Sequence, residues 1–368
     1  MQAAAVFRQY DGADKFALFN IFDYPSLHYC SLICYGNFFV TIQQNSKAES
    51  GSTDNYFTKR DKTNMFEKQN ELIKSGVITL VGQPNVGKST LLNTLLGQKI
   101  SIVSPKPQTT RNRILAIIND PGYQIIMLDT PGLHEASAEL NQEMVKTALD
   151  TLREVDVIVF IVDATAPLPG KGRNPASYLS AARAATPVIL LINKVDLLAR
   201  EQLLPIIEAY QGLHDFKAII PISALKNKGM NIMIEELLKL LPMGPRYYPE
   251  DIPTDASERF LIEEIIREKV FLLTSREIPY STAVVVDRFT EEKGRNLVTI
   301  DATILIEKKS QKGIIIGKGG KKLRQIGTSA RIDIERLLER KVMLRLWVKI
   351  QKNWTRNNQV LKELGYRG

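Results

Sequence analysis

The stretch Gly82-Gln83-Pro84-Asn85-Val86-Gly87-Lys88-Ser89 follows the apolar run Val77 to Val81 and precedes a helix-like segment that opens with Ser89-Thr90. It matches G-x-x-x-x-G-K-[ST], the phosphate-binding P-loop. A strand before the loop and a helix after it are the context that this motif needs, because main-chain N–H groups and the helix N-terminus then face the phosphates. The sequence therefore predicts an α/β P-loop domain, with a mostly parallel sheet and helices on both faces.

The residues of this loop predict particular contacts with a nucleotide. Gly82 and Gly87 can adopt backbone angles that other residues avoid, so that N–H groups turn towards phosphate. Lys88 is expected to reach the β- and γ-phosphates as a catalytic charge, and Ser89 to ligate Mg²⁺. Three further residues are expected to contact the nucleotide: Asn85, Val86 and Thr90.

A second motif, Asp129-Thr130-Pro131-Gly132, follows the strand-like run Tyr123 to Leu128. Ligands of open α/β sheets lie outside the carboxyl ends of the strands, which places Asp129 where it can hold Mg²⁺, directly or through water. The N–H of Gly132 is expected to meet the γ-phosphate and to take part in catalysis. Leu133 stands where many GTPases carry the glutamine that orients the attacking water, and a leucine cannot do so.

A third and a fourth motif predict a reader of the base. Asn193-Lys194-Val195-Asp196 follows the apolar run Val188 to Ile192, and Ser223-Ala224 follows the run Ala218 to Ile222. Guanine presents two adjacent donors that one carboxylate can accept, so Asp196 is the expected specificity residue. Asn193 can bridge to neighbouring loops, the stem of Lys194 can cover the base, and a backbone N–H of Ser223-Ala224 could bond guanine O6. The four motifs together predict a guanine-nucleotide pocket.

A polar stretch between the first two motifs, Pro107-Gln108-Thr109-Thr110-Arg111, predicts a switch loop. A threonine hydroxyl here can join Mg²⁺ only when the γ-phosphate is present. We favour Thr110 over Thr109 as this metal ligand and as a catalytic residue, although their spacing leaves both open.

The C-terminal part predicts a second domain with the order α-β-β-α-α-β, which is similar to a type II KH domain. Its second and third helices are joined by Gly317-Lys318-Gly319-Gly320. A KH loop of this kind clamps about four single-stranded nucleotides. The predicted elements are a helix over 262–274, strands over 281–289 and 297–307, a short helix around Gly313, a helix to about Arg340, a strand over 342–350 and a short helix over 358–364.

Charge supports RNA binding by this second domain. From Lys308 to Gly368 there are 17 Lys and Arg against four acids, whereas the whole chain carries a net charge of +9. Positive charge concentrated on one module is the electrostatic footprint of nucleic-acid binding. The glycines Gly317, Gly319 and Gly320 would let the RNA backbone approach, while Lys318, Lys321 and Lys322 would meet phosphate.

Residues 74–368 resemble the Era family of bacterial GTPases. The resemblance rests on the four motifs, the Gln-Thr-Thr-Arg switch, Leu133 after Asp-Thr-Pro-Gly, and the KH order. It implies GTP hydrolysis, binding to small-subunit ribosomal RNA near its 3′ end, and a role in small-subunit assembly. Relatives with an asparagine at the position of Asn85 include GTPases stimulated by K⁺, so the resemblance also suggests a K⁺ site there.

Composition sets the remaining expectations. The domains expected are an N-terminal extension without regular order (1–73), a GTPase domain (74–243), a linker (244–256) and a KH domain (257–368). Met65 leaves open whether the chain's start was assigned too early. Two neighbouring cysteines, Cys30 and Cys34, and no other indicate a reducing compartment. The start lacks a signal-peptide pattern. We expect a cytoplasmic monomer and leave open a bacterial or an organellar setting.

Two other functions are alternatives to an RNA-binding assembly factor. A membrane-associated signalling GTPase could use the basic C-terminal domain to bind anionic lipid at the inner face of the cell membrane, but the tail shows no clear continuous apolar stripe. An RNA-modifying GTPase would need a second catalytic constellation such as a reactive cysteine, and residues 74–368 contain no cysteine.

Overall fold

The computed structural model describes two short N-terminal strands and most of the chain after residue 71. The described residues are 32–35, 38–41, 72–104, 106, 110–130, 149–166, 168–169, 175–275, 277–291, 294 and 296–365. The chain divides into two compact units, Met1–Thr63 and Asn64–Gly368. In the first unit, β1 (Leu32–Tyr35) pairs with β2 (Phe38–Thr41) as an antiparallel hairpin.

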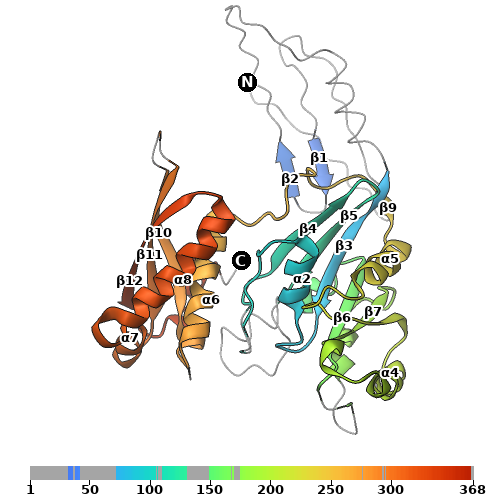
Figure 1. The fold of residues 1–368 in the computed structure, drawn as a ribbon. Coiled ribbons are helices and arrows are strands. Elements are labelled where there is room, and N and C mark those ends of the chain that lie inside the picture. Colours follow the sequence, from blue (N-terminus) through green and yellow to red (C-terminus); the bar gives the residue numbers. More distant parts are fainter. Residues whose placement is uncertain are drawn as a thin grey trace, which may run out of the picture. The chain divides into compact units, whose positions relative to one another are not determined.

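The second unit begins with an α/β domain built on a seven-stranded sheet (Figure 1). Six strands lie in the order β4-β5-β3-β6-β7-β8, and β9 pairs with the start of β3. Within that row of six, only β4 runs antiparallel to its neighbour. The strands are β3 (Ile73–Val81), β4 (Ile114–Asp120), β5 (Tyr123–Asp129), β6 (Val157–Asp163), β7 (Val188–Asn193), β8 (Phe216–Pro221) and β9 (Met243–Gly244).

Both faces of this sheet are buried, which explains its continuous apolar runs. Successive residues of β6 alternate between two cores: Val157 and Val159 lie in one, Ile158 and Phe160 in the other. The helices α2 and α5 pack into the first core, and α4 into the second. The helical elements are α2 (Lys88–Leu96), η1 (Pro175–Ala181), η2 (Val195–Leu197), η3 (Arg200–Gln202), α4 (Leu203–Gln211) and α5 (Met230–Leu240).

The segment between the two domains is bound along the edge of the α/β sheet. Pro253 O accepts from Ile117 N at 2.9 Å, and Thr254 Oγ1 donates to Leu115 O at 2.6 Å. The fully buried Gln124 accepts from the backbone N–H groups of Tyr247 and Tyr248 at 2.7 and 3.0 Å. The predicted linker is therefore an ordered strap that runs beside β4 and β5.

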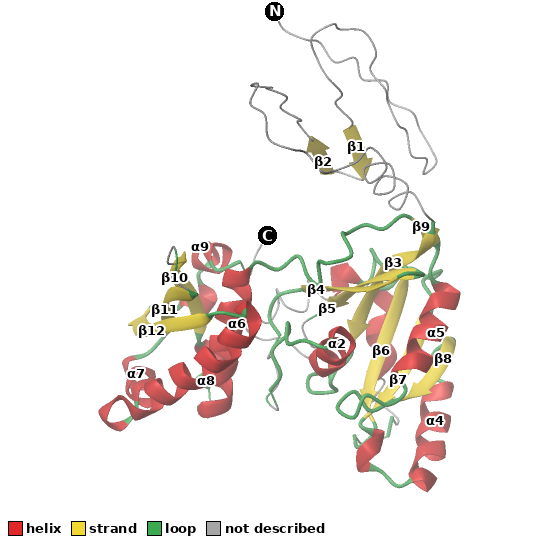
Figure 2. Cartoon of the chain, turned by 45° about the horizontal axis from the view of Figure 1, so that its top comes forward, coloured by secondary structure: helices red, strands yellow, loops and turns green. Residues whose placement is uncertain are grey.

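The C-terminal domain has the predicted α-β-β-α-α-β order, in which β11 pairs antiparallel with β10 and parallel with β12. Figure 2 shows α6 and α8 together on one face of this sheet. The elements are α6 (Glu258–Leu273), η4 (Pro279–Ser281), β10 (Ala283–Glu291), β11 (Leu297–Ile306), α7 (Lys309–Ile316), η5 (Lys318–Gly320), α8 (Lys321–Leu338), β12 (Lys341–Ile350), η6 (Trp354–Arg356) and α9 (Asn358–Glu363).

The core of this domain forms between the sheet and the helices. Alternate residues of β11, among them Ile300 and Ile304, meet Ile262 and Ile266 of α6 and Ile326 of α8. This period of two on a strand and about 3.6 on a helix is what the sequence pattern predicts. Among the described residues, no helix is long and apolar enough to cross a membrane.

Candidate functional site

The P-loop turns so tightly that side chains cannot be accommodated at two of its positions. A Cβ on Gly82 would lie 2.3 Å from Ile161 O, and a Cβ on Gly87 would lie 2.3 Å from Asn193 Nδ2. Gly87 also has φ +103°, a left-handed conformation that favours glycine. Both glycines are therefore required by the packing of the loop against its neighbours, independently of any nucleotide.

Lys88 is the first residue of α2, and its ammonium lies within the loop. Only 7% of the residue is exposed, and Nζ donates to Gly82 O at 3.0 Å and to Gln83 O at 3.1 Å. Burial lowers the pKa of Lys88 to about 8, and the nearby Asp129 charge acts in the opposite direction. The loop thus holds a desolvated cation whose partners are two carbonyl dipoles, which favours the approach of an anion.

Three oxygen-bearing side chains meet beside this lysine. The hydroxyl oxygens of Ser89 and Thr110 lie 3.0 Å apart, and Ser89 Oγ donates to Asp129 Oδ2 at 2.8 Å. Asp129 is fully buried, and Ser101 Oγ also donates to its Oδ2 at 2.8 Å. The other carboxylate oxygen, Oδ1, is buried without a hydrogen-bond partner. Such an unsatisfied oxygen beside two hydroxyls is a natural ligand for a hard cation.

Burial raises the pKa of Asp129, while the Lys88 charge and the hydrogen bonds from Ser89 and Ser101 oppose that rise. A cation at Oδ1 would favour the carboxylate form further. Ser101 was not predicted from sequence. It lies in a loop that matches no motif, and only the fold brings it to the end of β5.

The base-reading loops are tied together by Asn193. Its Nδ2 donates to Val86 O at 2.7 Å, and its Oδ1 accepts from Ala224 N at 2.9 Å. One buried side chain thereby fixes the P-loop, the end of β7 and the Ser223-Ala224 loop relative to one another. This is the bridging position that the sequence suggested for Asn193.

Asp196 lies exposed in the short helix η2. This helix begins directly after Lys194, which has a left-handed φ of +68°. Lys194 Nζ donates to Asp163 Oδ2 at 2.6 Å. Burial alone would raise the pKa of Asp163, but hydrogen bonds from Lys194 and Thr165 outweigh it and hold that pKa below its usual value. Asp163, at the end of β6, was not predicted from sequence because it belongs to none of the four motifs.

The Ser223-Ala224 loop differs in one respect from its sequence-based interpretation. Ser223 N donates to Lys228 O at 3.1 Å, and Ala224 N donates to Asn193 Oδ1. Both N–H groups are therefore engaged inside the protein, the first because Ser223 and Lys228 form a β-bridge and the second because Asn193 accepts from it. A contact of Ala224 N with guanine O6 would have to share or replace the bond to Asn193, and it stays a prediction.

The remaining predicted nucleotide contacts are placed as follows. Asn85 is exposed at the tip of the P-loop with φ +65°, Val86 is buried beneath it, and Thr90 is partly buried on α2. Gly132, Leu133 and Thr109 lie outside the described residues.

The Gly-x-x-Gly loop forms a tight turn, η5, between α7 and α8. Gly317 has φ +71° and ψ 173°, a conformation essentially restricted to glycine, and a Cβ there would lie 2.8 Å from Lys322 Cβ. Gly319 and Gly320 also have positive φ, of +59° and +76°, but nothing lies within 4 Å of a Cβ at either position. The outer side of the turn is therefore open, and Lys318 and Lys321 are exposed beside it.

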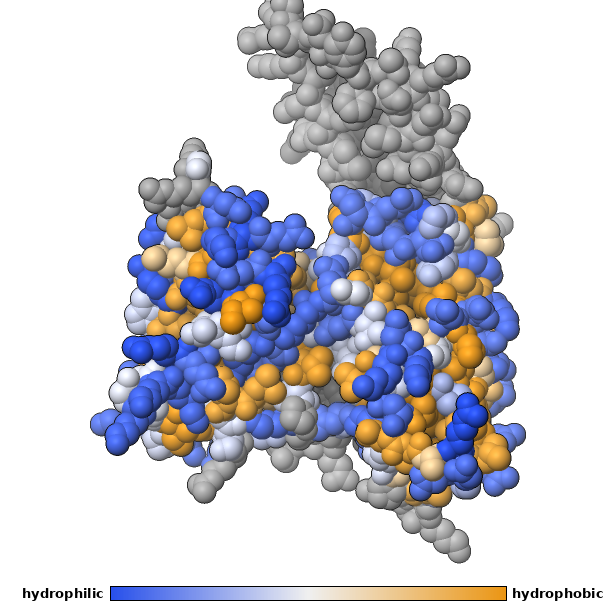
Figure 3. Space-filling view, viewed as in Figure 1, coloured by the Kyte–Doolittle hydropathy of each residue, from blue (hydrophilic) through white to orange (hydrophobic). Residues whose placement is uncertain are grey.

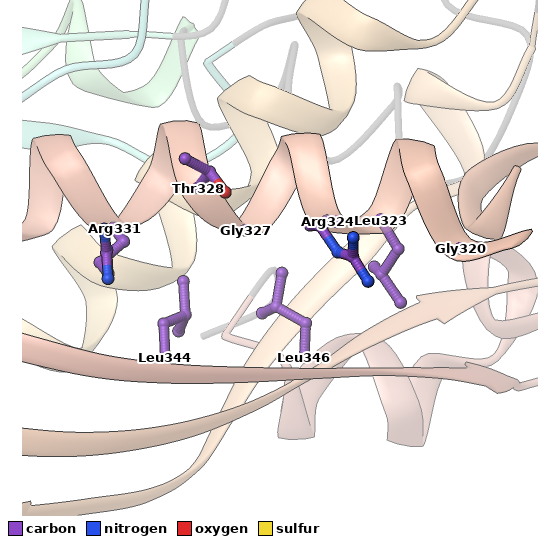
Figure 4. A pocket seen from close by; sticks show the side chains of 8 residues that line it. All are labelled: Gly320, Leu323, Arg324, Gly327, Thr328, Arg331, Leu344 and Leu346. Atoms are coloured by element: carbon purple, nitrogen blue, oxygen red, sulfur yellow. The ribbon is translucent and has the colours of Figure 1, made fainter.

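A groove of about 400 Å³ begins at Gly320 and runs between α8 and β12 (Figure 4). Leu344 and Leu346 form its floor, while Arg324 and Arg331 extend from α8. Figure 3 shows hydrophilic surface following α8. Arg324 and Arg331 were missed from sequence, although they recur at helical spacing after the loop. The residues that line the groove are Gly320, Leu323, Arg324, Gly327, Thr328, Arg331, Leu344 and Leu346.

Two family models match the chain. Residues 77–194 match a family described as 50S ribosome-binding GTPase, and residues 277–355 match the KH domain family. The first match contains the P-loop and the Asp129-Thr130-Pro131-Gly132 motif and ends at Lys194, within the third motif, and the second contains the Gly-x-x-Gly loop and the groove. The matches confirm the predicted fold classes of both domains.

Several curated relatives carry the name GTPase Era. The GTPase Era of Syntrophus aciditrophicus is 50% identical over 298 residues, which are 80% of this chain and 96% of that protein. The GTPase Era of Geobacter metallireducens is 51% identical over 293 residues, 80% of this chain and 98% of the relative.

Two solved structures also resemble the chain over most of its length. A crystal structure of an Aquifex aeolicus Era variant bound to GDP and AlF₄⁻ has a TM-score of 0.76 and 40% identity, covering 80% of this chain and 100% of its own. A crystal structure of Era with MgGDPNP and nucleotides 1506–1542 of 16S ribosomal RNA has a TM-score of 0.76 and 41% identity, with the same coverage. The chain therefore belongs to the Era family of GTPases, enzymes that hydrolyse GTP to GDP and phosphate.

Proposed function

We propose that this GTPase binds small-subunit ribosomal RNA near its 3′ end through its KH domain and acts in assembly of the small ribosomal subunit. The observation that carries the proposal is the open Gly-x-x-Gly turn at the head of a groove that Arg324 and Arg331 line. A related Era has been crystallised with nucleotides 1506–1542 of 16S ribosomal RNA, and this chain is 41% identical to it.

In this proposal the α/β domain holds Mg²⁺ and a guanine nucleotide. Ser89, Thr110 and Asp129 would hold the metal, and their oxygens suit it because Mg²⁺ prefers oxygen ligands. Bound Mg²⁺ neutralises charge on the phosphates during transfer. Lys88 would leave its carbonyl partners to meet the β- and γ-phosphates. The proposed roles of the P-loop N–H groups, of Gly132 and of Asp196 are those predicted from sequence.

The KH domain would take single-stranded RNA across the Gly-x-x-Gly turn and into the groove. Backbone phosphates would pass over Gly319, where no side chain obstructs them, and Lys318, Lys321 and Lys322 would supply positive charge. The apolar floor formed by Leu344 and Leu346 would contact bases. Arginine side chains at the rim could stack on bases or pair with phosphate.

RNA crosslinking with sequencing tests this function directly. The intact chain would be crosslinked in cell extract with a non-hydrolysable GTP analogue and, separately, with GDP. Crosslinks should concentrate at the 3′ end of small-subunit ribosomal RNA and map to the Gly-x-x-Gly turn and groove. Crosslinks spread evenly over unrelated RNAs, or located only on the α/β domain, would contradict the proposal.

Asp196→Asn should weaken GTP and GDP binding at least about 100-fold, because two hydrogen bonds to a carboxylate are lost and each contributes about 1.5–3 kcal/mol. The new amide can donate to the carbonyl that xanthine carries in place of the guanine amine, so xanthosine nucleotides should now bind more tightly than guanosine nucleotides. Calorimetric titration of both in parallel measures this. The exposed Asp215 provides the matched control, Asp215→Asn. Unchanged guanine preference in Asp196→Asn would disprove the base-reading assignment.

GTP hydrolysis should be several-fold faster in KCl than in NaCl at equal ionic strength. The candidate K⁺ ligand is Asn85, an exposed residue at the tip of the P-loop where an added cation could share the charge of the phosphates. Single-turnover rates in the two salts measure the effect. Asn85→Ala should abolish the difference while retaining GTP binding. Equal rates of the unaltered protein in both salts would remove the proposed K⁺ site.

The lipid-binding alternative has less support. The apolar face of the basic helix α8 is already occupied, because Ile326, Ala330 and Ile334 are buried in the KH core. We propose that the protein acts as a cytoplasmic monomer, as expected from the sequence. Light scattering would test the monomer, and sedimentation with anionic vesicles would test the alternative of peripheral membrane association.

A further inference from the structure

The switch loop of the α/β domain is anchored in the KH domain by Arg111. This residue is 4% exposed, although it carries a permanent charge. Its guanidinium donates to Thr282 O at 2.8 Å, to Tyr280 O at 2.8 Å and to Pro279 O at 3.1 Å. The cation also lies 5.9 Å from the ring centre of Phe271 and 5.8 Å from that of Trp354.

Two of these acceptors belong to the turn η4 and the third, Thr282, directly follows it, between α6 and β10 of the KH domain. Backbone carbonyls can face one cation together only if the turn keeps a defined shape. The planar guanidinium, with five donors in fixed directions, matches such an arrangement, and an ammonium does not. The position of Arg111 and the shape of η4 therefore depend on each other.

The residue before Arg111 is the candidate metal ligand. Thr110 is buried, and its hydroxyl lies 3.0 Å from Ser89 Oγ. Neighbouring Cα atoms are about 3.8 Å apart, so Arg111 cannot move far without moving Thr110. A single peptide unit thus joins the candidate metal ligand Thr110 to Arg111, which is bound to the KH domain.

The same turn also contacts α7, the helix that leads into the Gly-x-x-Gly loop. Ser281 Oγ accepts from Gln311 Nε2 at 2.8 Å, and Gln311 Oε1 accepts from the N–H groups of Glu307 and Lys308 at 3.0 and 2.9 Å. Gln311 is 5% exposed and lies in α7, whose C-cap is Gly317. Trp354 Nε1 donates to Ser281 O at 3.0 Å and holds the turn from a third direction.

We propose that Arg111 is a positioning residue that couples the state of the nucleotide to the RNA loop. With GTP, Thr110 would be held at the metal, and Arg111 would hold η4 and, through Ser281 and Gln311, α7 in the RNA-binding arrangement. With GDP that constraint would be released. Because coupling between two binding sites is reciprocal, RNA would also favour the GTP arrangement of Thr110. The inference rests on the proposed roles of Thr110 and of the Gly-x-x-Gly loop.

Other contacts between the domains make Arg111 testable without separating them. Lys99 Nζ lies 2.5 Å from Glu268 and 2.9 Å from Asp333, and Val103 N donates to Glu268 Oε1 at 3.0 Å. Lys106 Nζ donates to the carbonyls of Phe271 and Thr274. These ties lie before Thr110 in the sequence and do not involve η4, so they should persist when Arg111 is replaced.

The test measures RNA affinity of the full chain with a non-hydrolysable GTP analogue and with GDP, using nucleotides 1506–1542 of 16S ribosomal RNA as the probe. The unaltered protein should bind at least about tenfold more tightly with the analogue. In Arg111→Lys the ratio of the two RNA affinities should fall to within about twofold of one, while the RNA affinity measured with GDP is retained. The exposed Arg113 supplies the control, Arg113→Lys, which should keep the full ratio.

Ser281→Ala tests the second half of the connection. It removes the hydroxyl that accepts from Gln311 but leaves the carbonyl groups bound by Arg111. The affinity ratio should fall, while affinity for the GTP analogue in the absence of RNA should match that of the unaltered protein. A merely structural Arg111 would lower RNA affinity equally with both nucleotides.

Three outcomes separate the claims. A full ratio in Arg111→Lys, or an equal loss with both nucleotides, overturns the inference and leaves the proposed function intact. Equal RNA binding by the unaltered protein with both nucleotides would overturn the coupling itself, and therefore the inference, but not the proposed RNA binding. Absence of RNA binding by the unaltered protein overturns the proposed function and, with it, the inference.

Discussion

Replacing Lys88 with alanine is expected to slow single-turnover GTP hydrolysis by about 100- to 1,000-fold, the usual cost of losing one preorganised charge from a transition state. Lys88 is a buried cation that interacts electrostatically with the candidate metal ligand Asp129, and its ammonium is already desolvated before a nucleotide arrives. A desolvated charge acts on the phosphates far more strongly than one in water. The change should be seen in rates measured at saturating GTP by rapid quench.

The folding control for this variant follows from the same burial. Burial lowers the pKa of Lys88 to about 8, which means that the free protein holds the charged form at a cost. Alanine removes that cost, so the melting temperature of the nucleotide-free variant should not fall. Lys239→Ala, at an exposed position of α5, is the matched control and should hydrolyse GTP normally. A Lys88→Ala protein that is folded and hydrolyses GTP at the normal rate would disprove the proposed role.

Leu133→Ala is the informative comparison for the same assay. If hydrolysis depends on Lys88 and the metal rather than on a side chain that holds the water, this variant should lose far less activity than Lys88→Ala. A collapse of the rate with GTP binding intact would show that Leu133 contributes to catalysis.

The strands that precede the motifs were predictable because a strand buried on both faces appears in the sequence as a continuous apolar run. Val188 to Ile192 and Tyr123 to Leu128 correspond closely to β7 and β5. Their order in the sheet was not predictable, since the same runs suit any interior position. The antiparallel direction of the edge strand β4, Ile114–Asp120, was likewise not predictable and follows only from its pairing with β5 in the structure.

Parts of the site that depend on contacts between distant segments were missed for the same reason. Ser101 supports Asp129 from a loop 28 residues away, and Asp163 pairs with Lys194 across two neighbouring strands. Neither belongs to a motif, because a hydroxyl or a carboxylate at a strand end or in a loop has no sequence signature of its own. Arg111 was visible only as part of a polar loop, and its partners lie about 170 residues further along the chain.

Replacing Gly319 with aspartate should lower RNA affinity at least about 100-fold at low salt, because juxtaposed like charges cost several kcal/mol. The structure makes this an informative substitution. A Cβ at Gly319 meets nothing within 4 Å, so the variant can fold, and aspartate tolerates a φ of +59° better than most residues do. The new carboxylate would therefore lie on the open outer side of the turn, where the RNA backbone is proposed to pass. Gly319→Asn, of nearly equal size but neutral, should lose much less affinity.

Gly294→Asp is the matched control for this experiment. Gly294 belongs to the same domain, has a positive φ of +78° and also has nothing within 4 Å of a Cβ, but it lies in the turn between β10 and β11. The same added charge there should leave RNA affinity nearly unchanged. Lys321→Ala should have an intermediate effect and flatten the dependence of log affinity on log salt by about one unit. RNA affinity at several salt concentrations, with GDP binding as the folding control, measures all four variants. Full affinity in a folded Gly319→Asp protein would show that the RNA backbone does not cross this turn, and the groove between α8 and β12 would then have to bind RNA without it.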